Sequence, residues 1–138
     1  MDHDSALAPF NSAPEEEVIL GGPRDQLNSP TSFVDGSMIY GSDLHTVQSL
    51  RLFQNGLMRF QRDSERNVIL PRSRNARGDL CSDPGNRLFC FDAGDRWLNE
   101  HPALTALHTI FIREHNRIAR ELRKINPCWN DERLFQEV

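Results

Sequence analysis

The stretch from Pro102 to about Asn126 constrains the fold most, because it is predicted to form one long helix. Proline suits the first helical turn, where its missing N–H needs no partner, and Asn126-Pro127 is expected to end the helix. Apolar residues recur at spacings of three and four, which places them on one buried stripe. They are Leu104, Leu107, Phe111, Ile118 and Leu122, widened by Ile110 and Ile112.

Two shorter helices are expected before and after the long one. Asp43 is a good N-cap residue, and Gly56 is placed to end the helix that follows it. Its apolar residues have helical spacing: Leu44, Val47, Leu50 and Phe53. Asp131 is expected to cap a last helix with Leu134, Phe135 and Val138. The chain is therefore predicted to be mainly α.

The other segments carry strand and loop signals. Residues 57–60 and 68–71 are apolar runs that predict a hairpin, and residues 73–95 predict a loop. Prolines and glycines predict an irregular segment at residues 9–30, after a helical end at residues 1–8. With 138 residues, of which 38% are hydrophobic, we expect one small domain with long loops and little β structure.

A loop at residues 31–37 offers oxygen atoms at alternate positions, which face the same way in an extended chain. They are the side chains of Thr31, Asp35 and Ser37 and the carbonyl of Phe33. Such oxygens suit Ca²⁺, which takes about 6–8 of them. The acidic cluster Asp2-His3-Asp4 is a source of a further carboxylate, so that one ion would pin the N-terminal turn. The alternative is an ordinary strand over residues 32–40.

Charge and hydropathy exclude several classes of protein. The net charge of −4 argues against general nucleic-acid binding. No run approaches the roughly 18 apolar residues of a membrane span. Residues 1–20 lack the basic and apolar regions of a signal peptide.

Three histidines recur every seven residues along the long helix: His101, His108 and His115. Two helical turns separate neighbours by about 10.5 Å, which is too far for them to share one ion. Packing or surface roles are therefore favoured. The arginines of this helix alternate with glutamates, which is typical of a solvated face.

Cys81 and Cys90 bracket the turn-forming sequence Asp83-Pro84-Gly85. Either a disulfide hairpin or two free thiols is compatible with this spacing. Cys128 is free or has a partner outside this chain. Arg77-Gly78-Asp79 matches a cell-adhesion tripeptide, although three residues occur often by chance.

Several long segments resemble the animal haem peroxidase family, of the peroxidasin and myeloperoxidase type. The first, Thr-Ser-Phe-Val-Asp-Gly-Ser-Met-Ile-Tyr-Gly-Ser at residues 31–42, corresponds to the family's calcium loop. The others follow in the family's order: residues 90–95, 99–109, 113–119 and 126–137. The resemblance covers roughly residues 24–138 together with Asp2-His3-Asp4, and it implies a partial haem peroxidase domain with a mainly α fold.

The resemblance implies two cofactors, haem b and Ca²⁺. His3 falls on the distal histidine, whose neutral imidazole moves a proton from one peroxide oxygen to the other. Asp2 and Glu100 fall on the carboxylates that the family esterifies to haem methyl groups. The implied calcium ligands are Asp4, Thr31, Phe33, Asp35 and Ser37. Cys81 and Cys90 match a family disulfide, which implies secretion.

Two departures from the family concern the haem site. The distal arginine belongs three residues before Glu100, where this chain has Trp97, and an indole offers one donor and no charge. Arg96 is the neighbouring substitute. His101 stands where myeloperoxidase has a methionine bonded to haem, so this third link is expected to be absent.

Two further departures concern length. Only residues 5–30 separate Asp4 from Thr31, which is shorter than in the family and implies an internal deletion within residues 1–30. Residues 31–138 would then hold the calcium loop and a helical core segment. The family's proximal histidine, which ligates the iron, is expected downstream of Val138, so the chain is interpreted as a truncated domain.

The function expected from the resemblance is reduction of hydrogen peroxide with oxidation of a halide or organic donor, with weak or no activity in this chain alone. A non-catalytic fragment that binds calcium or a protein partner is the alternative, because the apolar faces at Phe53, Phe111 and Phe135 would need cover. Adhesion through Arg77-Gly78-Asp79 is a third hypothesis.

Overall fold

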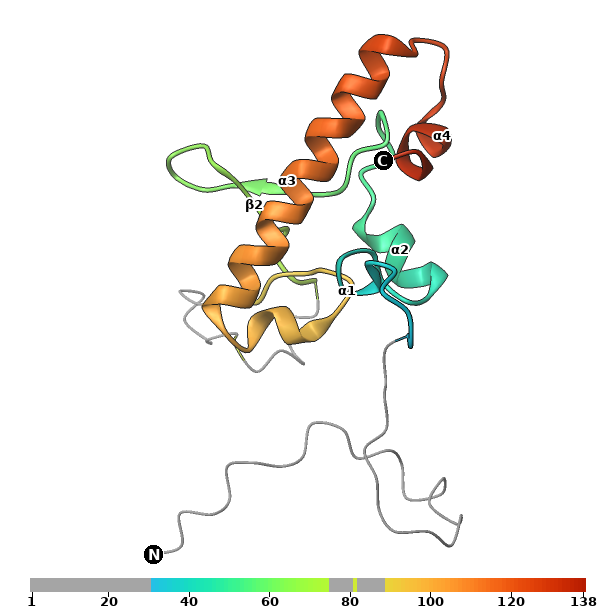
Figure 1. Cartoon of the computed structure of the whole chain (residues 1–138). Helices are drawn as coiled ribbons and strands as arrows, with labels where there is room; N and C mark the ends of the chain where they lie inside the picture. The colour runs from blue at the N-terminus through green and yellow to red at the C-terminus, as the bar shows by residue number, and fades with distance from the viewer. Residues whose placement is uncertain (1–30, 75–80, 82–88) are drawn as a thin grey trace, which may run out of the picture. The chain divides into compact units, whose positions relative to one another are not determined.

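The computed structural model describes residues 31–74, 81 and 89–138. The chain divides into two units, Met1–Val34 and Asp35–Val138, which we describe separately. The elements of the described residues are α1 (Ser37–Tyr40), α2 (Leu44–Leu50), β1 (Gln61–Arg62), β2 (Val68–Ile69), the 3₁₀ helix η2 (Arg96–Asn99), α3 (Pro102–Ile125) and α4 (Asp131–Gln136) (Figure 1). The described part is mainly helical, as predicted.

Some predictions lie outside the described residues. They concern the helical end at residues 1–8, the irregular segment at residues 9–30 and the tripeptide Arg77-Gly78-Asp79. Among the residues that are described, no helix is long and apolar enough to cross a membrane.

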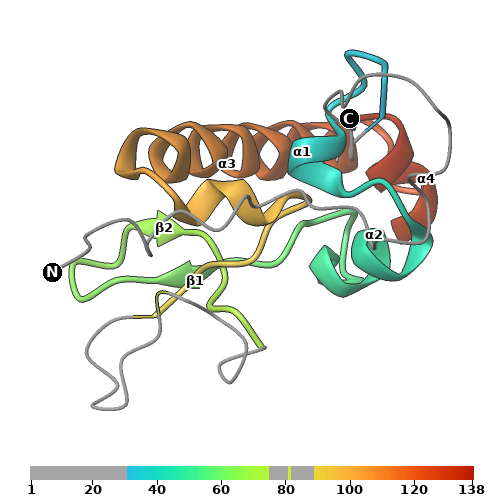
Figure 2. The ribbon, with the colours of Figure 1, turned by 90° about the horizontal axis from the view of Figure 1, so that it is seen from below.

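The long helix α3 is the central element, and its predicted ends are confirmed. Pro102 lies in the first turn, and the helix stops at Ile125. The N-cap is His101, whose Nδ1 accepts a hydrogen bond from the Ala103 N–H at 3.1 Å. Four elements pack against α3, namely η2, β2, α1 and α4 (Figure 2).

The predicted buried stripe of α3 is wrong for all its members except Ile112. Leu107 and Phe111 are exposed by 52% and 56%, and Leu104, Ile118 and Leu122 are only half-buried. The buried residues are instead His108, Ile112, His115, Asn116 and Ala119. The apolar pattern did not find this face because three of its members, His108, His115 and Asn116, are polar.

In the described residues, each helix contributes one side chain to the core, and two more come from segments between the elements. It consists of Ile39, Leu50, Met58, Leu70, Leu98, Ile112 and Phe135. Tyr40, Val47, Phe91 and Ala93 pack against it. Leu98 is the member of interest for function, because it anchors η2 in the core.

The strand considered for residues 32–40 is not formed, and its second half is helix α1. Gly36 and Gly41 flank this helix with φ values of 71° and 98°. These left-handed conformations favour glycine and turn the chain at both ends, so that an extended strand does not continue through them.

The capping predictions are confirmed for α2 and corrected for α4. Asp43 accepts a hydrogen bond from the Thr46 N–H at 3.0 Å, but α2 ends at Leu50 rather than Gly56. The cap of α4 is Asn130, not Asp131. The Asp131 carboxylate is used elsewhere, because it pairs with the buried Arg51 guanidinium at 2.8 Å.

The predicted hairpin exists, with its first strand placed too early. β1 pairs antiparallel with β2, Gln61 opposite Ile69 and Arg62 opposite Val68. Met58, which was assigned to the first strand, forms an isolated antiparallel bridge with Arg51. On the side away from Arg51, the N–H and carbonyl of Met58 are bound by the Asn116 side chain of α3, which takes the place of a further strand.

Candidate functional site

The predicted site residues that the structure describes best lie on one short turn, η2, and the residue after it. Asp95 caps the turn by accepting the Trp97 N–H at 3.1 Å, and the Glu100 N–H donates to the Trp97 carbonyl at 3.0 Å. Arg96 and Glu100 are both exposed. Neither side chain has a hydrogen-bond or ion-pair partner among the described residues, so both are available to another group.

The type of turn decides which side chains face the same way. In a 3₁₀ helix, residues three apart lie above one another. Trp97 and Glu100 therefore share one edge, and Arg96 shares a different edge with Asn99. The shift of the arginine by one residue places it out of line with Glu100, and Trp97 takes the aligned position.

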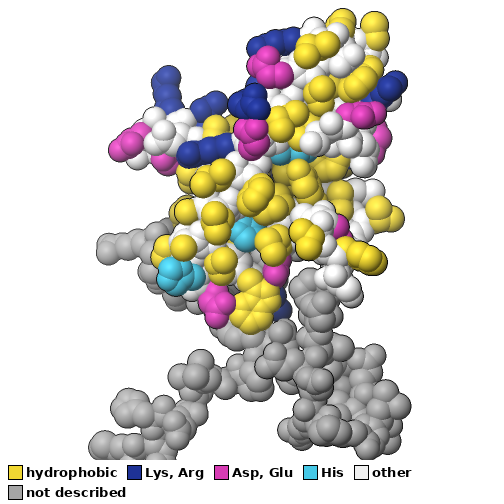
Figure 3. All heavy atoms as spheres, in the orientation of Figure 1, with side chains coloured by type: hydrophobic (Ala, Val, Ile, Leu, Met, Phe, Trp, Pro, Cys, Tyr) yellow, Lys and Arg dark blue, Asp and Glu magenta, His cyan; other side chains and the backbone are white. Residues whose placement is uncertain are grey.

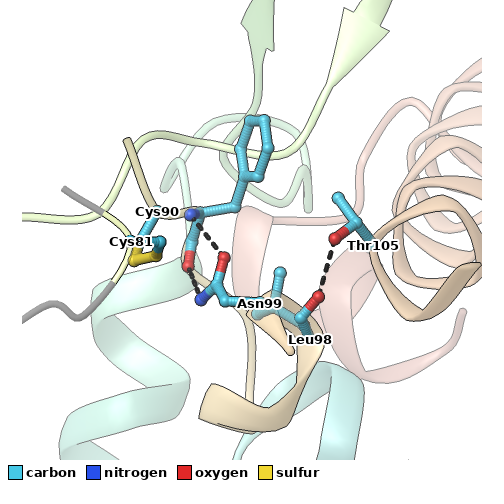
Figure 4. Close-up of a disulfide and its surroundings, with 6 residues drawn as sticks. Cys81, Cys90, Leu98, Asn99 and Thr105 are labelled. Atoms are coloured by element: carbon cyan, nitrogen blue, oxygen red, sulfur yellow. Dashed lines mark hydrogen bonds between the residues drawn. A yellow bond between two sulfur atoms is a disulfide. The ribbon is translucent and has the colours of Figure 1, made fainter. Parts of the chain in front are cut away.

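The Asn99 side chain fixes η2 to the chain at Phe91. Asn99 Oδ1 accepts the Phe91 N–H at 2.9 Å, and Asn99 Nδ2 donates to the Phe91 carbonyl at 2.9 Å (Figure 4). On another side of the turn, the Thr105 hydroxyl donates to the Leu98 carbonyl at 2.6 Å. Two neighbouring segments thus hold the residues directly before Glu100.

Phe91 is itself firmly anchored. Cys81 and Cys90 form a disulfide, which decides between the two alternatives left by the sequence (Figure 4). The Ser73 N–H donates to the Cys90 carbonyl at 2.8 Å, and the Asp92 N–H donates to the Pro71 carbonyl at 2.9 Å. Cys128 is exposed and not in a disulfide.

Helix α1 contacts the start of η2 through the backbone. The Gly94 N–H donates to the Ile39 carbonyl at 3.1 Å, and the Asp95 N–H donates to the Met38 carbonyl at 3.0 Å. A Cβ atom at Gly94 would overlap the carbonyl oxygen of Ser37. The predicted calcium ligand Ser37 is therefore on a helix that is bonded to the two residues directly before η2.

The predicted calcium ligands are described in two separate pairs. In the first unit, the Thr31 hydroxyl donates to the Phe33 carbonyl at 3.4 Å, a separation that suits two oxygens at right angles around one Ca²⁺, roughly 3.4 Å. In the second unit, an oxygen of the exposed Asp35 carboxylate accepts the Ser37 N–H at 3.0 Å.

The rest of the predicted set, Asp2, His3 and Asp4, lies outside the described residues. Within the described residues, no three His, Cys, Asp or Glu side chains lie close enough together to hold a metal ion.

The histidine repeat has structural roles in α3. His101 is exposed and caps the helix, whereas His108 and His115 are buried. The Tyr40 hydroxyl donates to His115 Nδ1 at 3.0 Å, and His115 Nε2–H donates to the Gly56 carbonyl at 2.8 Å. Burial lowers the pKa of His115, so its imidazole is neutral in this arrangement.

His108 differs from His115 in having one ring nitrogen without a partner. Its Nδ1–H donates to the Leu104 carbonyl at 2.7 Å. Its Nε2 is buried and has no hydrogen-bond partner in the described structure.

Comparison with known proteins identifies the family. The family model described as animal haem peroxidase matches residues 2–138. The chain belongs to the animal haem peroxidase family. Eosinophil peroxidase from Mus musculus is 45% identical over 137 residues, which cover 94% of this chain and 19% of that protein. Myeloperoxidase from Homo sapiens is 45% identical over 123 residues, which cover 83% of this chain and 16% of that protein.

A solved structure agrees with this membership in the animal haem peroxidase family. Peroxidase A from Dictyostelium discoideum matches with a TM-score of 0.68 and 31% identity, over 82% of this chain and 22% of that one. The chain thus spans about one fifth of the length of the first of its curated relatives. The described fold is that of part of an animal haem peroxidase.

Family membership implies a haem cofactor, and the chemistry of η2 fits one. An ester to a haem methyl group needs a carboxylate that is accessible and not already paired. Glu100 meets both conditions. The exposed Arg96 guanidinium is the nearest described cation in the sequence. The described residues of η2 and Glu100 are therefore compatible with a bound haem.

Sequence reasoning missed the two asparagines that organise the site and the core. Asn99 and Asn116 each bind both backbone groups of one residue, Phe91 and Met58 respectively. A signal was present for Asn116, because it lies one turn from Ile112 and three residues before Ala119 on the same helical face. No comparable spacing signal marks Asn99.

Proposed function

We propose that this chain is part of a haem-dependent peroxidase that reduces hydrogen peroxide while oxidising a halide or a small organic donor. The observation that carries the proposal is the Glu100 carboxylate at the end of η2, which is exposed and has no partner among the described residues. It stands at the position of an esterified carboxylate in the family resemblance. The high identity to proteins named peroxidases supports the same reaction class.

In this proposal Glu100 and Asp2 hold haem b through ester bonds. The bound haem supplies an iron that changes oxidation state as peroxide is reduced. His3 carries the proton between the two peroxide oxygens. Asp4, Thr31, Phe33, Asp35 and Ser37 bind a Ca²⁺ that holds the turn carrying His3.

Arg96 has a minor role in the proposal. A guanidinium that polarises peroxide must face the same space as the haem carboxylate, but the 3₁₀ geometry places Arg96 on a different edge from Glu100. We therefore assign it weak electrostatic help. His101 caps α3 through its Nδ1, and no haem link is proposed for it.

The chain alone is expected to show weak or no turnover, because it spans about a fifth of the length of its relatives. The test is to refold it with haemin and Ca²⁺ and to measure the Soret band and guaiacol oxidation. Sustained turnover would contradict the expected inactivity. Glu100→Gln is the matched variant: equal haem attachment in both proteins would contradict the role of Glu100.

A second candidate function is that of a non-catalytic fragment that binds calcium or a protein partner. It is supported by Trp97 at the arginine position and by the exposed apolar side chains of α3. Calorimetry with Ca²⁺ should show binding that Asp35→Ala removes. Glu65→Ala, at an exposed carboxylate outside the loop, is the control, and binding by the Asp35 variant equal to the parent would exclude the loop.

We also propose that the protein works in an oxidising, extracellular environment. The Cys81–Cys90 disulfide supports this, since such bonds persist mainly in secreted proteins. Residues 31–138 would form the calcium loop and helical core segment of a partial haem peroxidase domain. Nucleic acid is not proposed as a partner, in view of the net charge of −4.

A further inference from the structure

We propose that Asn99 is the positioning residue for Glu100, so that its amide fixes the direction in which this carboxylate is presented to the cofactor. The inference rests on the proposed role of Glu100 and adds a residue that touches neither peroxide nor haem. Three observations carry it: the anchoring of Phe91, the pairing of both amide groups of Asn99, and a second use of the same device elsewhere in the chain.

Phe91 is a fixed point because of its place in a short ladder. It forms an isolated antiparallel bridge with Arg72. The hydrogen bonds of that ladder are made by its two neighbours, Cys90 and Asp92, to Ser73 and Pro71. The disulfide at Cys90 adds a covalent link next to it. The N–H and carbonyl of Phe91 itself therefore point away from the bridge.

The Asn99 amide binds the side of Phe91 that faces away from Arg72, where a further strand would otherwise pair. One oxygen and one N–H of the side chain meet the N–H and carbonyl of Phe91, both at 2.9 Å. A side-chain amide has the same donor and acceptor as a peptide group, so both backbone groups are satisfied at once. Neither aspartate nor leucine, which are similar in size, can make both bonds.

The clamp fixes η2 against rotation about its own axis. Leu98 is buried in the core at 1% exposure, and Asn99 is bound to Phe91, so two of the three edges of the 3₁₀ turn are held. Glu100 lies on the third edge. Loss of the Asn99 clamp would leave the turn held at Leu98, by its burial and by the bond from Thr105, and would allow the direction of Glu100 to vary.

The same device occurs at Met58, which supplies an internal control. Met58 forms an isolated bridge with Arg51. Its N–H donates to Asn116 Oδ1 at 2.8 Å, and its carbonyl accepts from Asn116 Nδ2 at 3.1 Å. Asn116 belongs to the middle of α3 rather than to η2, so the same substitution there tests the clamp without releasing Glu100.

The first measurement is residue-level amide hydrogen exchange on the full chain without haem. In Asn99→Leu, exchange at the Phe91 and Glu100 amides should rise at least tenfold, while the Met58 amide is unchanged. In Asn116→Leu the pattern should be reversed. Asn99→Asp keeps the acceptor for the Phe91 N–H and should give intermediate exchange. Unchanged exchange at Glu100 in Asn99→Leu would overturn the proposal.

The second measurement is the haem that stays with the chain after denaturation, following incubation with haemin and hydrogen peroxide. Ester formation joins a carboxylate oxygen to a haem methyl carbon, and the two hydrogens removed reduce one hydrogen peroxide to two waters. Asn99→Leu should lower the retained haem several-fold, and Asn99→Asp should lower it less. Retention by Asn99→Leu equal to the parent would overturn the proposal.

The variant Glu100→Gln separates the two levels of inference. If it retains as much haem as the parent, the role of Glu100 in the proposed function fails, and the positioning role fails with it. If it loses haem while Asn99→Leu does not, the proposed function stands and only the role of Asn99 is overturned. Parallel losses in Asn99→Leu and Glu100→Gln, with Asn99→Asp between them and the parent, support positioning.

Discussion

The two long faces of α3 differ in a way opposite to that of an ordinary surface helix. The inner face, toward the core, carries His108, His115 and Asn116 beside Ile112 and Ala119. The outer face carries Leu107, Ile110 and Phe111, each more than half exposed. Figure 3 shows hydrophobic side chains gathered over this helix on the face in view.

The comparison shows that polar side chains of the inner face join α3 to a neighbouring segment of the chain. Burying a polar group is costly unless it is hydrogen-bonded, and Asn116 and His115 are both bonded to backbone groups of the segment 56–58. The apolar side chains of the outer face, in contrast, are exposed to water. An apolar stripe that lies in water is typical of a surface that another part of a protein covers, which agrees with a chain that matches about a fifth of the length of its first relative.

The largest effect is expected on the inner face, from Asn116→Ala. This change leaves both the N–H and the carbonyl of Met58 buried without a partner, and each such group costs about 1–3 kcal/mol. We expect the free energy of unfolding in urea to fall by about 2–4 kcal/mol. The exposed Asn67→Ala is a control that should stay close to the parent. A loss below about 0.5 kcal/mol would contradict the assigned role.

A smaller effect is expected from the pH dependence at His115. Burial lowers its pKa below the ordinary 6.5, with the nearby Arg51 charge acting in the same direction and the bond to Gly56 opposing it. The unfolded chain then binds a proton that the folded chain does not, so stability should fall as the pH drops below about 6.5 and level off below the folded pKa. The slope is at most about 1.4 kcal/mol per pH unit.

The measurement for His115 is thermal or urea unfolding at pH 7.5 and 5.5, for the parent and for His115→Gln. Glutamine does not titrate, so the difference between the two proteins should shrink as the pH falls. The other histidines are common to both proteins and cancel in the comparison. An equal pH dependence in both would show that His115 does not contribute.

The smallest effect on stability is expected on the outer face. Leu107→Ser and Phe111→Ser remove apolar groups that are already in water, and surface substitutions usually change stability by less than about 0.5 kcal/mol. Binding of the dye ANS should decrease, because the exposed apolar surface is smaller. Ile112→Ser, one residue from Phe111 but buried, is the matched contrast and should destabilise strongly.

The sequence predicted those features that depend on neighbours in the chain. The ends of α3 follow from Pro102 and Asn126-Pro127, and the Asp43 cap bonds to Thr46 three residues away. The motif around Glu100 was found by its resemblance to the family, and the structure places that residue on an accessible turn.

Features that depend on distant partners were not predicted. Asn116 binds Met58 across 58 residues, and no local pattern indicates such a partner. The run at residues 37–40 is apolar and β-prone, yet it forms α1 because two flanking glycines turn the chain and Gly94 and Asp95 bind its carbonyls. The polar inner face of α3 was missed because apolar periodicity gives no weight to buried, paired histidine and asparagine.

The contact between α1 and the start of η2 has a consequence for variation. Its two hydrogen bonds run from main-chain N–H groups to main-chain carbonyls, so they survive replacement of the Met38 or Asp95 side chain. Gly94 is the exception, since any added carbon would collide with Ser37. Substitutions of most side chains at this junction should therefore be tolerated. A single methyl group at position 94, however, would push α1 and residues 94–95 apart.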